Sequence, residues 1–139
     1  MERIFSKLAV STLLLATLAG CSSGSDKQRQ VEAIASHRAT IISNNLPIEH
    51  GPLTIMQAKA KGSVVEIMMI YNGDGEVSPQ QLVAKSVNYY CSNSEVTANL
   101  SHGVIYDIKV RSERGQLLID QIVSIDTCSS LSDESKDEK

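Results

Sequence analysis

The chain has 139 residues, and its 13 basic and 16 acidic side chains give a formal net charge of −3. With 42% hydrophobic residues, this length is enough for one domain with a modest core. The slight acidic excess argues against the basic surface that nucleic-acid binding requires, so we expect no nucleic-acid partner.

Residues 1–20 have the layout of a secretory signal peptide. Arg3 and Lys7 give a positively charged start, residues 8–18 form a short apolar run, and small residues lead into Cys21. A membrane span needs about 20 apolar residues, so this run is too short to remain as an anchor. The sequence Leu-Ala-Gly-Cys that ends at Cys21 is typical of a bacterial lipobox, in which the cysteine becomes a lipidated N-terminus. Because several acyl chains anchor a protein stably, we predict a lipoprotein; the alternative is an ordinary cleaved signal with a chance cysteine.

The residues after Cys21 predict a tether and then a helix. Residues 21–30 include a serine- and glycine-rich stretch that is typical of a flexible linker. Over residues 27–44, apolar side chains repeat at helical spacing and form one stripe, which also contains Arg38. Two asparagines and a proline end this helix before a connector at residues 46–52.

Residues 53–60 and 63–71 predict a β-hairpin with its turn at Lys61 and Gly62. In that register both faces are apolar at one end, whereas a half-solvated antiparallel sheet alternates apolar and polar residues. One face must therefore be core, and the other must be covered by a helix of the chain or of a partner. We assign the second face to partner binding, with these central contacts: Leu53, Ile55, Met68 and Ile70.

The sequence after the first hairpin predicts a longer helix and then a shorter one. The sequence Ser-Pro-Gln-Gln that begins at Ser78 combines an N-cap, a proline at the first helical position and a glutamine three residues after the cap. It predicts a helix over residues 78–91, followed by a short helix near residues 94–100. The helix-flanked edge near Val83 and Val87 is our second candidate for partner binding.

The C-terminal part predicts a second hairpin and a tail. Residues 104–112 and 116–125 form its strands around an Arg-Gly turn, which places Lys109 opposite Asp120 as an attractive cross-strand pair. Residues 129–139 are polar and charged, and we predict that this tail is disordered.

Cys91 and Cys128 are the cysteines that remain once Cys21 is assigned to lipid. An even pair in an oxidising compartment favours a disulfide, whereas the alternative, a metal or redox pair, lacks a Cys-x-x-Cys motif and an adjacent histidine. We therefore predict one disulfide within an α+β domain at residues 31–128. Its antiparallel sheet of four to five strands is built from two hairpins and packs with an N-terminal, a central and a short helix.

Signals of enzymatic activity are weak. His37, His50 and His102 lie in different predicted elements, and no nucleophile motif accompanies them. Residues 72–76 place oxygen ligands between glycines, but they lack the ligand spacing and the closing glutamate of an EF-hand. We therefore expect no catalytic residue, no metal and no cofactor.

The order of several short segments resembles a known family. The lipobox is followed by Ser-Asn-Asn-Leu-Pro-Ile from Ser43, Gly-Pro-Leu-Thr-Ile-Met from Gly51, Val-Glu-Ile-Met-Met-Ile from Val65, Asn-Tyr-Tyr-Cys up to Cys91, and Gly-Val-Ile-Tyr from Gly103. This collinear set resembles the beta-type, AspS-like pilotins of the type II secretion system. The resemblance extends over residues 31–128, which would be the pilotin domain.

The resemblance implies a disulfide-braced domain that binds the C-terminal helix of a secretin subunit. Such a protein uses the lipoprotein-sorting machinery and delivers the secretin to the outer membrane, where it stays lipid-anchored and faces the periplasm. Ser22 fits outer-membrane sorting, because the usual retention signal after the lipidated cysteine is aspartate. The alternatives are a periplasmic inhibitor or an envelope-stabilising lipoprotein and, as a third choice, a hydrolase.

Overall fold

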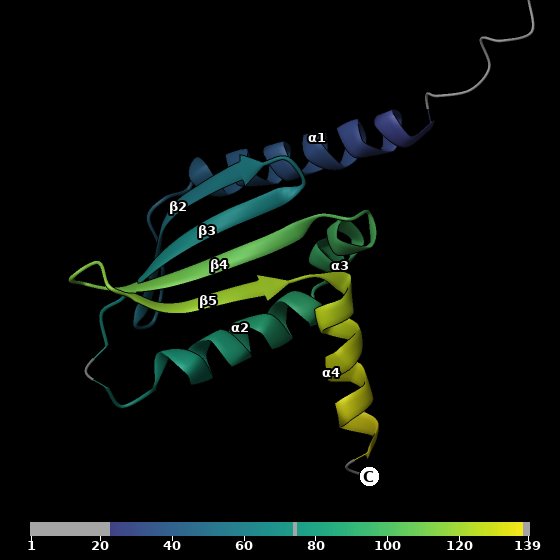
Figure 1. Ribbon diagram of the computed structural model, residues 1–139. Coiled ribbons are helices and arrows are strands. Elements are labelled where there is room, and N and C mark those ends of the chain that lie inside the picture. The colour runs from purple at the N-terminus through teal and green to yellow at the C-terminus, as the bar shows by residue number, and fades with distance from the viewer. Residues whose placement is uncertain (1–22, 74, 138–139) are drawn as a thin grey trace, which may run out of the picture.

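The computed structural model describes residues 23–73 and 75–137, so Cys21 and the predicted signal segment lie outside the described residues. In the described part, four helices and five strands follow one another along the chain (Figure 1). Their bounds are α1 (Ser23–Ser43), β1 (Ile48–His50), β2 (Leu53–Lys61), β3 (Val64–Tyr71), α2 (Pro79–Ser92), α3 (Ser94–Ser101), β4 (Ile105–Ser112), β5 (Leu117–Val123) and α4 (Ile125–Asp137). No helix within these residues has the apolar length that a membrane crossing requires.

All five strands belong to one sheet in the order β1-β2-β3-β4-β5. Neighbouring strands are antiparallel except β3 and β4, which run parallel. The parallel pair arises because α2 and α3 carry the chain from the end of β3 back to the start of β4. The predicted α+β fold and both hairpins are confirmed, and the sheet is mixed where we expected only antiparallel pairing.

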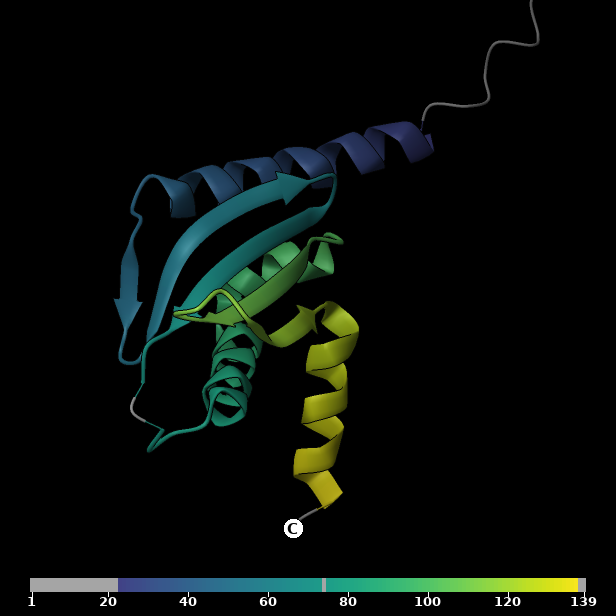
Figure 2. The same cartoon turned by 60° about the vertical axis from the view of Figure 1, so that its left-hand side comes forward.

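Helices α1, α2 and α3 lie on one face of the sheet and enclose the core there (Figure 2). Every second side chain of β3 is buried beneath them, namely Val65, Ile67 and Met69. The helices contribute small or branched residues to the same core, such as Ala35 and Val83. We call this the covered face of the sheet.

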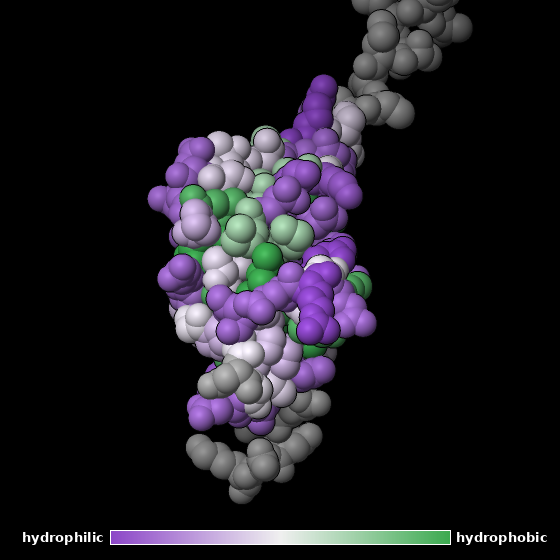
Figure 3. Space-filling model, turned by 90° about the vertical axis from the view of Figure 1, so that its left-hand side faces the viewer, coloured by the Kyte–Doolittle hydropathy of each residue, from purple (hydrophilic) through white to green (hydrophobic). Residues whose placement is uncertain are grey.

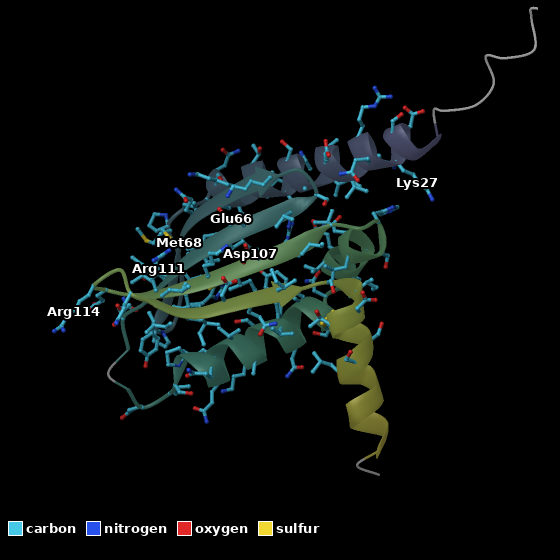
Figure 4. The ribbon with its side chains drawn as sticks, viewed as in Figure 1. Lys27, Glu66, Met68, Asp107, Arg111 and Arg114 are labelled. Atoms are coloured by element: carbon cyan, nitrogen blue, oxygen red, sulfur yellow. A yellow bond between two sulfur atoms is a disulfide. The ribbon has the colours of Figure 1, made fainter. Side chains whose placement is uncertain are left out.

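The opposite, open face mixes apolar and charged side chains. It carries the intervening residues of the two central strands: Glu66, Met68, Ile70, Asp107, Lys109 and Arg111. Figure 3 shows the side of the molecule that lies at the left in Figure 1, where apolar surface gathers in the middle and charged surface borders it. Met68 and Arg111 project toward this side (Figure 4).

Both hairpins depart from the predicted turns. In the second hairpin Lys109 pairs with Asp120, as expected, but next to the turn Arg111 pairs with Leu117, and a β-bulge between Val110 and Arg111 restores the predicted register. In the first, Lys61 pairs with Val64, so the turn consists of Gly62 and the residue after it, one position later than predicted. Gly62 has a φ of +58°, a left-handed conformation that glycine adopts without the steric cost that other residues meet.

A β-bulge at Met56 changes which residues of the first hairpin share a face. The pairing shifts by one residue there, so Leu53 lies opposite Tyr71 and Ile55 lies opposite Met69. One inserted residue reverses the faces of the strand beyond it. The predicted pairing of Leu53 and Ile55 with the open-face residues of β3 is therefore wrong.

Helix α1 already begins at Ser23, so the predicted flexible tether is helical from that residue onward. Asp26 in the first turn pairs with Arg29, and Gln28 donates a hydrogen bond to Glu32 at 2.7 Å. Pairs three or four residues apart stabilise a helix, and an acidic residue in its first turn complements the helix dipole. These local contacts outweigh the linker-like composition.

Helix α2 begins as predicted. Ser78 is the N-cap: its side chain accepts a hydrogen bond from the backbone N–H of Gln81, and the Gln81 side chain accepts one from the Ser78 backbone N–H. Such a capping box satisfies two backbone donors that the first turn leaves without partners.

Helix α4 occupies a segment that we predicted to be disordered from residue 129 onward. At its start Cys128 forms the predicted disulfide with Cys91 of α2. One turn later Leu131 packs against the core. The covalent link and this burial offset the polar composition of the segment, so the ordered part extends beyond Cys128, as far as Asp137.

Candidate binding groove

A groove lies between α1 and α2 on the covered face of the sheet. Its floor consists of Leu53 and Ile55 of β2 together with Met69 of β3, all of which are buried. Leu82 of α2 and Val96 of α3 continue this apolar lining. The groove has a volume of about 450 Å³, which lies within the usual range of ligand-binding pockets.

Two consecutive tyrosines of α2 form one wall. The ring of Tyr90 contacts that of the fully buried Tyr106 edge-on, with 5.2 Å between the ring centroids. Burial raises the pKa of Tyr90 to about 12, with a further upward contribution from Tyr106 and a downward one from Arg38. Tyr89 is 64% exposed at the rim, so the wall joins a fixed ring to an accessible one.

Arg38 of α1 lines the groove opposite these tyrosines. Its Nη1 donates a hydrogen bond to Oε1 of Glu95 at 2.8 Å, which ties α1 to the first turn of α3. Its Nε–H is buried and has no acceptor among the described residues. The guanidinium therefore brings a positive charge with unused donor capacity to a groove with an apolar floor.

The residue types of the groove suit the binding of an apolar partner. Within residues 23–73 and 75–137, no three His, Cys, Asp or Glu side chains cluster in a way that could hold a metal ion. An apolar floor with aromatic and cationic side chains along its edges is typical of surfaces that receive the apolar face of an amphipathic helix.

The structure divides the four residues predicted to contact a partner. Leu53 and Ile55 form part of the groove floor, whereas Met68 and Ile70 lie on the open face. The bulge at Met56 is the physical reason, because it turns the start of β2 over relative to the end of β3.

The second predicted location lies closer to the groove. Val83 and Val87 are buried beneath α2, and their neighbours Leu82 and Ser86 line the groove. The edge of the central helix is thus part of the candidate site, with the two valines supporting it from within the core.

Sequence reasoning missed Arg38, Tyr89 and Tyr90. Arg38 occupies a position of the apolar stripe of the first helix, between the buried Ala35 and Ala39. A charged residue in such a stripe is the signal that could have identified it, because a buried or half-buried cation needs a partner. Only the folded arrangement brings this stripe against the tyrosines of α2.

Comparison with known proteins gives consistent results. Residues 27–128 match the family model for the type II secretion system (T2SS) pilotin, S protein. The chain is similar to the solved pilotin EpsS from the Vibrio vulnificus type 2 secretion system, with 45% identity, a TM-score of 0.70, and coverage of 75% of this chain and 96% of that one. The solved pilotin AspS from Vibrio cholerae gives 39% identity and a TM-score of 0.71, over 77% of this chain and 100% of that one. Pilotin AspS 2 from Escherichia coli O78:H11 (strain H10407 / ETEC) is 26% identical over 112 residues, which are 78% of this chain and 80% of that protein.

Proposed function

Because the chain belongs to the type II secretion system pilotin family, we propose that it binds the C-terminal segment of a type II secretin in the groove between α1 and α2. We further propose that it delivers this secretin to the outer membrane through a lipid on Cys21. The observation that carries the proposal is the groove itself: an apolar floor beneath a gap in the helix layer, in a domain of this family.

The groove suits a segment that becomes helical on binding. A docked helix would present residues spaced i, i+3, i+4 and i+7 to Leu53, Ile55 and Met69, and would close the gap between α1 and α2. Ordering a flexible segment costs several kcal/mol, so the partner must bury a substantial apolar face. This function requires no catalysis.

Binding is tested by titration calorimetry of the chain from residue 22 onward with a peptide of the secretin C-terminal segment. Tyr89→Asp places a charge at the exposed rim and should weaken binding about tenfold or more, since aromatic anchors at a groove commonly dominate affinity. Met56→Asp is the matched control, because Met56 is 44% exposed and lies outside the groove lining.

Met68→Asp separates the groove from the open face. The substitution should leave the peptide affinity unchanged, because Met68 lies on the face away from the groove. If it abolishes binding while the domain keeps its circular dichroism spectrum, the open face is the binding surface and the proposed site is wrong.

Delivery is tested in cells with Cys21→Ser in the full chain. Without the cysteine no lipid can be attached, so the protein should leave the membrane fraction and the secretin should no longer reach the outer membrane. Wild-type fractionation of the Cys21→Ser protein would contradict the lipid anchor, and normal secretin placement would contradict delivery by this protein.

A further inference from the structure

Positive charge lines the groove without a carboxylate among the lining residues. Arg38 projects from α1 and Lys85 from α2, so the cations come from its two walls, and His50 lies at the end of β1. The remaining lining residues are apolar or uncharged. The chain as a whole is acidic, with a formal net charge of −3, so this local excess of cations differs from the average surface.

The charge of Arg38 is only partly neutralised within the protein. Its carboxylate partner, Glu95, lies outside the groove lining and its side chain is 67% exposed, whereas the Arg38 side chain is 22% exposed. An exposed ion pair contributes little and is readily exchanged, because water stabilises the released carboxylate nearly as well. The guanidinium has five N–H donors in a planar fork, and Glu95 accepts a hydrogen bond from one of its terminal nitrogens, Nη1.

We infer that the groove selects a helix whose apolar stripe is flanked by a carboxylate, and that Arg38 binds this carboxylate in competition with Glu95. The inference rests on the proposed function, because it describes the segment that the groove receives. The inference is argued from charge complementarity. Two cations beside an apolar floor fit an amphipathic helix with an acidic flank, and they disfavour a helix with a basic flank. Lys85 adds attraction from the opposite wall, as a flexible point charge without the fork geometry of arginine.

Substituting Glu95 tests the inference, because a structural role and a binding role of Arg38 predict opposite changes in peptide affinity. If Arg38 acts only as a structural tie between α1 and α3, then Arg38→Gln and Glu95→Gln should weaken peptide binding alike, because either change removes the same ion pair. If Arg38 binds the partner's carboxylate, the two changes should have opposite effects. Arg38→Gln should weaken binding, and Glu95→Gln should strengthen it by removing the internal competitor.

The experiment titrates the chain from residue 22 onward with two peptides of the secretin C-terminal segment. One has the natural sequence, and the other has glutamine in place of each acidic residue that flanks its apolar stripe. For the natural peptide, Arg38→Gln should reduce affinity about fivefold and Glu95→Gln should raise it about twofold. For the glutamine peptide, both substitutions should leave affinity unchanged. Arg114→Gln is the control of equal charge, because Arg114 lies in the exposed β4–β5 turn.

The outcomes separate this inference from the proposed function. If Tyr89→Asp weakens both peptides while Arg38→Gln changes neither, the groove binds the segment and the carboxylate inference is wrong. Equal losses from Arg38→Gln and Glu95→Gln would also overturn it, as would a secretin segment with no acidic residue beside its apolar stripe. If neither peptide binds the wild-type chain, both the proposed function and the inference fail.

Discussion

The covered and open faces of the sheet place their side chains in different surroundings. On the covered face, Ile67 is fully buried among apolar neighbours, and the helices leave a gap over the groove floor. On the open face, the next residue along the same strand, Met68, has Glu66 and Ile70 beside it. Neighbouring positions of β3 thus belong to a dry core and to a wetted surface.

The open face is held by a chain of ion pairs. Glu66 Oε2 lies 3.2 Å from Lys61 Nζ and 3.6 Å from Lys109 Nζ, and Lys109 also donates a hydrogen bond to Asp107. The hydrogen bond to Asp107 raises the pKa of Lys109 above its ordinary value, against the opposing effect of desolvation. Linked charges let an uncovered sheet face remain soluble, whereas the groove has no such network across its floor.

The largest expected effect concerns the link that fixes the covered face. Cys91 and Cys128 are separated by 37 residues, and replacing both by alanine should lower the free energy of unfolding by about 4 kcal/mol. Urea unfolding with and without reductant measures this loss. The reduced wild-type chain should match the double variant, and a small difference between the oxidised wild type and the variant would contradict a bracing role.

A matched pair of substitutions in β3 compares the faces directly. Ile67→Ala should cost about 3 kcal/mol of unfolding free energy, because it leaves a cavity in a filled core. Met68→Ala should cost less than about 1 kcal/mol, because its site is open to water on one side. Chemical denaturation of both variants measures the two losses of unfolding free energy. Equal losses would mean that the open face is as tightly packed as the core.

Alkaline pH should act on the tyrosine wall of the groove. The pKa of Tyr90 is raised in the folded state to about 12, so the unfolded chain loses this proton first and stability falls as pH rises above 10. At a pH one unit above the ordinary pKa of tyrosine, the free energy of unfolding should be lower by about 1 kcal/mol. Tyr90→Phe should remove that part of the pH dependence, and in absorbance titrations the substitution should remove an ionisation that occurs well above the ordinary tyrosine pKa. Loss of an ionisation at the ordinary pKa would contradict the buried position.

The smallest expected effect comes from the ion pairs of the open face. Lys109→Gln should lower the free energy of unfolding only slightly, because the ammonium group of Lys109 is accessible to water, which screens its charge. The loss should shrink in high salt. Thermal denaturation at low and high ionic strength measures both quantities. A salt-independent loss would show that Lys109 acts through packing of its aliphatic chain rather than through charge.

Local features were predictable wherever one short segment determines the structure. The Ser-Pro-Gln-Gln sequence at Ser78 defined a helix start, because cap chemistry depends on adjacent residues. The predicted pairing of Lys109 with Asp120 is also present, but it depends on a β-bulge between Val110 and Arg111 as well as on the turn. The bulge at Met56 was not predictable in this way, since the apolar residues around it favour either face equally. It follows that alternation predicted which strands exist but assigned the partner face wrongly.

The groove required information that lies far apart in the chain. Arg38, Leu53 and Tyr90 come from three elements, and their meeting depends on the order of the strands and on the crossover through α2 and α3. Helix α4 was missed for a similar reason, because its stability depends on Cys91 and on the burial of Leu131 rather than on its own composition.

The parallel pairing of β3 with β4 has a consequence for the order of folding. The first hairpin and α1 are contiguous in sequence, so they can assemble early. The pairing of β3 with β4 can form only after the intervening helices α2 and α3 have folded. Tyr90 is supported by Tyr106 of β4, and α2 is fastened by Cys128 near the end of the chain. One wall of the groove is therefore completed only after nearly the whole chain is available to fold.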